Sequence, residues 1–95
     1  MGKGYSFLER FGENAELLEE PLPGQSIVEI AGDTRVLVEN HMGVTAYARE
    51  KIVIRMKFGF LNVCGCGLEI IRMNRDQLVI RGRIHGVSLC RRGNE

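Results

Sequence analysis

The sequence has no apolar run approaching the roughly 18 residues that a membrane-spanning helix needs. Its N-terminus, MGKGYSFLERFGENAELLEE, also lacks the basic-then-apolar order of a secretory signal. Cysteine is scarce and odd in number, at three residues, which argues against a secreted disulfide scaffold and favours free thiols. These absences predict a cytoplasmic protein, with contact to a membrane only at its surface.

Proline is also scarce, and both prolines fall in Pro21-Leu22-Pro23-Gly24, a segment that cannot continue a helix. Before it, apolar residues recur every three or four positions between glutamates, which predicts an amphipathic helix over residues 5–20 with Ser6 as its cap. The apolar stripe consists of Phe7, Leu8, Phe11, Ala15 and Leu18. We expect residues 1–24 to form this helix and a linker, and residues 25–92 to form one β domain.

The charges are distributed unevenly along the 95 residues. Residues 1–48 carry three basic against eight acidic side chains, whereas residues 49–95 carry ten against four. This asymmetry suits head-to-tail contacts between copies, or an acidic partner at the basic half. The alternative is that the acids only solvate the N-terminal helix.

From Ser26 onward, short runs rich in β-branched residues alternate with two to four turn residues. The spacing predicts an all-β domain, an antiparallel meander of about seven or eight short strands that forms a small sandwich or roll. The predicted strands include SIVEI, TRVLVEN, VTAYA, IVIRMKF, GFLNVC, LEIIRM, QLVIRGRI and HGVSLC. Alternation directs Ile52, Ile54, Met56, Leu78, Ile80 and Ile84 inward. A change of phase near Gly86, which suggests a bulge, then turns Val87 and Leu89 inward.

Basic residues occupy the outward positions of the same strands, and we take them as the candidate interaction face. They are Lys51, Arg55, Lys57, Arg81 and Arg83. Such a row suits an acidic protein or an anionic membrane surface. Nucleic-acid binding is less favoured, because interleaved aromatic residues and a recognition helix are missing.

The stretch GFLNVCGCGLEI places Cys64 and Cys66 between glycines. In an extended strand their Cα atoms would lie about 6.6 to 7 Å apart, at or beyond the usual disulfide limit. A zinc site would also need Cys90, His41 or His85, and no second C-x-x-C or H-x-x-x-H pair exists. We therefore predict no metal and no cofactor. The thiols are interpreted as small hydrophobes, and the glycines as sites of a bulge or of close backbone approach.

Catalysis would need a nucleophile, a base and an orienting group. Nothing in the spacing of the cysteines, His41, His85, Glu39 and Asp76 brings these groups together, so we predict no enzyme and no catalytic residue. The segment Glu39-Asn40-His41-Met42-Gly43 instead predicts a turn, since asparagine and glycine tolerate positive φ.

Residues 38–89 resemble the YabP/YqfC family of sporulation proteins, and the YqfC branch most closely. The resemblance is carried by Glu39-Asn40-His41, Gly43-Val44, Phe58-Gly59 and the run from Leu78 to Ile84, and it extends upstream through residues 27–33. Met42 departs from the family pattern, which often has a basic residue there.

The resemblance implies a part in spore formation, in the mother cell, without enzymatic activity. It also implies a partner, because members are often encoded beside a membrane-embedded sporulation protein, called YqfD for this branch. An adaptor or assembly factor is the function expected. Because a sheet that does not close leaves open edges, self-association or strand addition is a further expectation.

Overall fold

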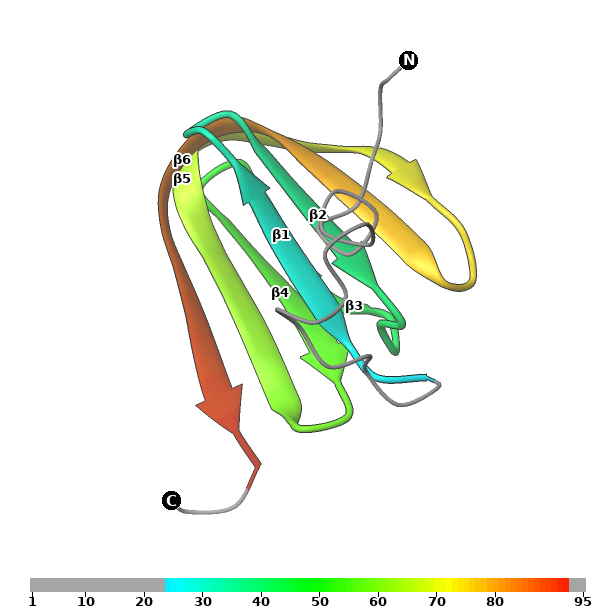
Figure 1. Ribbon diagram of the computed structural model, residues 1–95. Helices are drawn as coiled ribbons and strands as arrows, with labels where there is room; N and C mark the ends of the chain where they lie inside the picture. The colour runs from blue at the N-terminus through cyan, green and yellow to red at the C-terminus, as the bar shows by residue number, and fades with distance from the viewer. Residues whose placement is uncertain (1–23, 93–95) are drawn as a thin grey trace, which may run out of the picture.

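A computed structural model of the protein describes residues 24–92. This range forms one six-stranded antiparallel sheet with the strand order β1-β2-β6-β5-β4-β3 (Figure 1). The strands are β1 (Ile27–Ala31), β2 (Arg35–Glu39), β3 (Val44–Tyr47), β4 (Lys51–Met56), β5 (Gly59–Met73) and β6 (Gln77–Arg91). No helix occurs within the described range, and the helix predicted over residues 5–20 lies outside it. The all-β prediction is confirmed.

The described range contains six strands rather than the predicted seven or eight, because β5 and β6 are each 15 residues long. GFLNVC and LEIIRM are both parts of β5, and QLVIRGRI and HGVSLC are both parts of β6. The glycines between these runs do not end the strands. They lie where the pairing of β5 with β6 shifts register, so they mark bulges inside continuous strands.

The sheet also departs from a simple meander, because β2 pairs with β6 rather than with β3. The long β5–β6 hairpin is central, and a short hairpin joins each of its sides. The β1–β2 hairpin pairs with residues 77–81 of β6, whereas the β3–β4 hairpin pairs with residues 59–64 of β5. Each short hairpin thus extends a different half of the long one.

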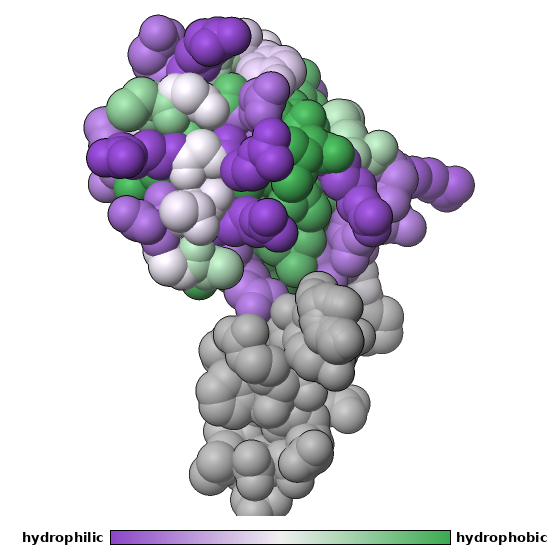
Figure 2. All heavy atoms as spheres, turned by 90° about the horizontal axis from the view of Figure 1, so that it is seen from above, coloured by the Kyte–Doolittle hydropathy of each residue, from purple (hydrophilic) through white to green (hydrophobic). Residues whose placement is uncertain are grey.

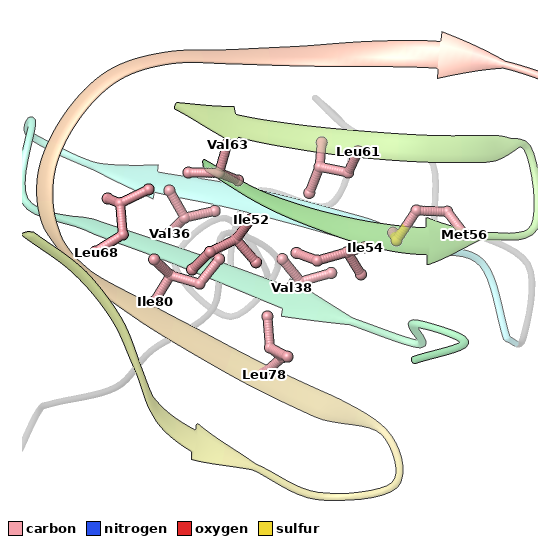
Figure 3. Close-up of a cluster of buried hydrophobic side chains, with 10 residues drawn as sticks. All are labelled: Val36, Val38, Ile52, Ile54, Met56, Leu61, Val63, Leu68, Leu78 and Ile80. Carbon is pink, nitrogen blue, oxygen red and sulfur yellow. The ribbon is translucent and has the colours of Figure 1, made fainter. Parts of the chain in front are cut away.

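Because β5 and β6 bend sharply (Figure 1), the sheet folds over into two layers. The first layer contains β1, β2 and the hairpin end of β5 and β6. The second contains β3, β4, the start of β5 and the end of β6. Figure 3 shows ten buried side chains between the layers. They are Val36, Val38, Ile52, Ile54, Met56, Leu61, Val63, Leu68, Leu78 and Ile80.

Close backbone approach at the bend requires glycine. A Cβ atom built on Gly65 would lie 1.9 Å from the carbonyl oxygen of Arg83. One built on Gly82, where φ is +148°, would lie 2.8 Å from the carbonyl oxygen of Gly67. These distances confirm the interpretation of the glycine-bracketed cysteines as a region where two strands meet closely.

Carbonyl oxygens in the turns of the two short hairpins accept hydrogen bonds from backbone amides at the bend. The Gly65 amide donates to the carbonyl oxygen of Glu50 at 3.0 Å, in the β3–β4 turn. The Ile84 amide donates to that of Asp33 at 2.8 Å, in the β1–β2 turn. The register shifts leave these two amides without a partner in the β5–β6 ladder. They are hydrogen-bonded to the turns instead, as backbone groups away from water need to be.

The predicted inward positions agree with the structure over most of their length. Cys64 lies opposite Gly86 and Gly65 opposite Ile84, so His85 is the extra residue of a bulge at the predicted place. Ile84 and Val87 pack against the core. The remaining residue of this series, Leu89, shares the inner face but is 66% exposed, because it lies on the open side of the second layer.

Candidate functional site

The five predicted basic residues are all exposed, but the structure does not bring them onto one face. Lys51 and Arg55 alternate with inward residues of β4, so they lie on the outer side of the second layer. Arg81 lies on the outer side of the first layer, and Arg83 lies at the bend. Because the two layers turn their inner sides toward each other, their outer sides face opposite directions. The predicted row therefore divides in two.

The part with unopposed charge is the second-layer outer face. Lys51 and Arg55 are about 13 Å apart along one strand, and Val53 lies between them. Arg55 pairs with Phe60 of β5, which is 38% exposed. The outward residues of β4, β5 and β6 that form this face are Lys51, Val53, Arg55, Phe60, Asn62, Cys64, Ser88 and Cys90. None of them is acidic, so the face combines positive charge with apolar surface.

Arg81 differs, because it has an acidic partner. Its Nη2 lies 2.9 Å from Oε1 of Glu69, and both side chains are more than half exposed. Exposed pairs of this kind contribute little to stability, but the carboxylate offsets the positive charge locally. Arg81 is thus a weaker candidate for binding an anionic partner than Lys51 or Arg55.

Lys57 lies in the turn between β4 and β5, where its Nζ donates to the carbonyl oxygen of Gly24 at 2.9 Å. This bond ties the start of the β domain to the second layer. The Lys57 ammonium retains further donors for a partner.

The predicted turn residues brace several parts of the fold. The Gly43 amide donates to Nδ1 of His41 at 2.9 Å, and Nε2 of the same ring lies 2.9 Å from the carbonyl oxygen of Asn74. Nδ1 is the acceptor, so the proton resides on Nε2, which donates to Asn74. His41 therefore joins the β2–β3 connection to the β5–β6 turn.

Asn40 extends this bracing toward β1. Its φ of 62° lies in the left-handed region, and Gly43 also has positive φ, at 110°. The Asn40 amide group donates to the carbonyl oxygen of Gln25 at 2.7 Å, and its backbone N–H donates to that of Asp76 at 2.6 Å. Glu39 accepts a bond from the side chain of Gln77 at 3.3 Å. The motif that carries the family resemblance thus has a structural role.

The three cysteines are free and exposed, so the interpretation of Cys64 and Cys66 as small hydrophobes is wrong. Alternation directs Cys64 outward opposite Lys51, away from the core. Sγ of Cys66 lies 3.7 Å from Nε2 of His85. Among residues 24–92, no three His, Cys, Asp or Glu side chains gather in a group that could hold a metal ion.

The other predicted catalytic candidates remain apart. His41 bonds to Asn74 and Gly43, whereas His85 contacts Cys66. In the described part of the chain, no carboxylate bonds to His85 to complete a nucleophile, base and orienting group. The absence of enzymatic activity stays a prediction.

Sequence reasoning missed a contact between the layers at their β3 side. The hydroxyl oxygen of Tyr47 accepts a bond from the Ile70 amide at 3.0 Å. An open pocket beside it is lined by Tyr47, Ala48, Arg49, Gly67, Leu68 and Glu69. The side seen from above in Figure 2 also carries a band of hydrophobic residues between hydrophilic ones. Folding of the sheet, rather than any local pattern, creates these features.

Within residues 24–92 there is no helix with the length and hydropathy to cross a membrane. Comparison with known proteins shows that the model of the YabP family matches residues 23–95. No curated protein and no solved structure matches the chain. The match includes every strand of the sheet.

Proposed function

Because the chain belongs to the YabP family, we propose that it is a non-enzymatic sporulation protein that serves as an adaptor or assembly factor. Family membership is consistent with a sporulation-related role. The turn residues that carry the resemblance to the YqfC branch support the fold, which favours a binding function over a chemical one. We place the protein in the cytoplasm of the mother cell, at the surface of a membrane when its partner is membrane-embedded.

The observation that carries this proposal is the second-layer outer face. It presents Lys51 and Arg55 on either side of Val53, with Phe60 directly opposite Arg55, and its outward residues on β4, β5 and β6 include no acid. Protein interfaces combine an apolar centre with a charged rim in this way, and the charges give orientation and a fast association rate. The partner is therefore expected to present an acidic rim around an apolar patch.

The partner we propose is a membrane-embedded, YqfD-like sporulation protein. Basic residues near an anionic membrane each contribute about 1 kcal/mol of attraction, so the same face would also be drawn toward the membrane that holds the partner. Binding of the partner and attraction to the lipid surface would then act in the same direction.

The test is a binding titration with the soluble part of the co-encoded membrane protein. The double variant Lys51→Glu/Arg55→Glu should weaken binding at least tenfold. The control Arg72→Glu/Arg75→Glu changes net charge equally, at exposed positions near the β5–β6 turn, and should bind like the wild type. Equal binding by all three proteins would overturn the assignment of this face. Lack of binding by the wild type would overturn the proposed partner.

The second candidate function is binding of an anionic membrane or nucleic acid through the same face. The lack of carboxylates among the outward residues of this face favours it. Liposomes with anionic lipid and short duplex DNA are the two further targets. DNA binding predicts that log affinity falls with log salt by about 0.9 per neutralised phosphate. A protein interface with an apolar centre predicts a weaker dependence on salt.

A further inference from the structure

The bend of the β5–β6 hairpin places a thiol next to an imidazole. Cys66 of β5 lies directly opposite Arg83 of β6, and both side chains are exposed. Nε2 of His85, the extra residue of the bulge, lies 3.7 Å from Sγ of Cys66. In the described part of the chain, the sulfur atoms of Cys64 and Cys90 have no such neighbour. Cys66 is therefore set apart from two cysteines that are equally open to solvent.

The fold fixes this pair of side chains, because both residues belong to strands that approach closely. A Cβ atom on Gly65, the residue before Cys66, would lie 1.9 Å from the Arg83 carbonyl oxygen. The amides of Gly65 and Ile84 are hydrogen-bonded to the turns of the short hairpins, which holds the bulge in place. The thiol and the His85 ring thus lie on two supported strands of the sheet.

Arg83 gives the Cys66 thiol a cationic neighbour. The Cβ atoms of directly opposite residues in an antiparallel pair are about 4.5 to 5.5 Å apart. Among the described residues no carboxylate pairs with Arg83, and Glu69, the one acid of β5, is already bonded to another arginine. Two further acids, Glu50 and Asp33, lie in the turns at the edges of the bend. An anion that reaches Cys66 would therefore find a guanidinium free to bind it.

The neighbouring imidazole supplies the base that a reactive thiol needs. The thiolate, rather than the thiol, is the nucleophile in thiol chemistry. Nε2 of a neutral His85 ring accepts the Cys66 proton when Nδ1 carries the ring hydrogen. We propose that Cys66 is a modification site, at which an anionic low-molecular-weight disulfide forms a mixed disulfide with the protein.

The exchange needs no reactant besides the disulfide. The Cys66 thiol gives its proton to Nε2 of His85, and the thiolate attacks one sulfur of the disulfide. The S–S bond of the disulfide breaks while a new S–S bond to Cys66 forms, and the released thiolate takes the proton from His85. Cys66 is oxidised, and one half of the disulfide is reduced to a thiol. Arg83 binds the anionic group of the incoming molecule.

Variants of the full chain with one cysteine each separate the three thiols. They are Cys64→Ser/Cys90→Ser, Cys66→Ser/Cys90→Ser and Cys64→Ser/Cys66→Ser. The probe is dithiobis(nitrobenzoic acid), a dianionic disulfide whose released thiolate is measured by its absorbance. Because all three thiols are exposed, access alone predicts similar rates. We expect the variant that retains Cys66 to react at least about tenfold faster than the other two. Similar rates for all three would overturn the proposal.

His85→Gln and Arg83→Gln test the roles of the two neighbours. With Cys66 as the only cysteine, His85→Gln should slow the reaction about tenfold, because the base is lost. With Cys64 as the only cysteine, it should leave the rate unchanged. Arg83→Gln should slow the reaction with the dianionic probe and have little effect with dithiodipyridine, a neutral disulfide. No effect of His85→Gln would overturn the proposed base, and equal effects of Arg83→Gln on both probes would overturn the preference for an anion.

The wild-type chain gives a measurement that needs no substitution. It is treated with less than one equivalent of the dianionic probe and quenched with acid, and tandem mass spectrometry locates the adduct. We expect the adduct on Cys66. An adduct spread evenly over the three cysteines, or concentrated on Cys64 or Cys90, would overturn the proposal. Circular dichroism checks that each variant above keeps its sheet, so that rates are compared between folded proteins.

Discussion

His41 and Asn74 are 33 residues apart in the sequence, and a 2.9 Å hydrogen bond joins the His41 imidazole to the Asn74 carbonyl oxygen. The other ring nitrogen accepts the Gly43 amide at 2.9 Å. One side chain thus holds the β2–β3 connection against the β5–β6 turn. The backbone N–H of Asn40 joins the same two parts of the chain, because it donates to the Asp76 carbonyl oxygen at 2.6 Å.

His41→Ala should lower the free energy of unfolding by about 0.5 to 1.5 kcal/mol, because two partly exposed backbone groups lose their hydrogen-bond partner. Urea denaturation measures this directly. The control His85→Ala removes an exposed ring whose nitrogen lies 3.7 Å from the Cys66 sulfur, and should change stability by less than about 0.5 kcal/mol. Similar losses in both variants would show that the bond to Asn74 contributes little.

Two substitutions at Asn40 distinguish the stability cost of its backbone conformation from the contribution of its side-chain hydrogen bond. Its φ of 62° is costly for alanine, by roughly 1 kcal/mol, and its side chain also bonds to Gln25. Asn40→Gly keeps the conformation and loses the bond, whereas Asn40→Ala loses both. We expect the alanine variant to be less stable than the glycine variant by about 1 kcal/mol in the same denaturation experiment. The reverse order would show that the left-handed conformation costs nothing here.

The sequence predicts the faces of the strands better than their connections. Alternation alone places Ile52, Ile54 and Met56 in the core, since a half-buried strand needs a period of two. The turn at Asn40 and Gly43 follows from residues that tolerate positive φ. Pairing of β2 with β6 has no local signal, because it joins residues about 40 positions apart.

The glycines at the bend explain why the strand number was overestimated. A glycine inside a β-rich run can end a strand, form a bulge or permit close approach, and the three have the same local pattern. At Gly65 the decisive contact is with Arg83, on another strand. The division of the basic residues has the same cause: alternation predicts that Arg55 and Arg81 point outward, but only the folding of the sheet sends them to opposite sides.

Gly65→Ala should destabilise the domain by about 3 kcal/mol or more, because the new methyl group would overlap the Arg83 carbonyl oxygen at 1.9 Å. Gly86→Ala is the matched control. A Cβ there meets nothing within 4 Å, so its effect should stay within about 0.5 kcal/mol. Thermal melts of both variants compare them. A mild effect of Gly65→Ala would mean that the backbone can move apart at the bend.

Because the three cysteines are exposed, we expect their thiols to be reactive and to contribute little to the stability of the domain. Under native conditions all three thiols should react with a thiol reagent, and elemental analysis should find no stoichiometric zinc. Replacing both Cys64 and Cys66 with serine should change the free energy of unfolding by less than about 1 kcal/mol, since neither side chain is in the core. A large loss of stability, or close to one metal per chain, would contradict this placement.

The core predicts how the domain responds to removal of residues 1–20. All ten of its side chains come from β2, β4, β5 and β6, so a chain beginning at residue 21 should still fold and melt cooperatively. Differential scanning calorimetry of both chains checks that each melts in a single cooperative transition. An unfolded truncation would show that the N-terminal segment supplies part of the core.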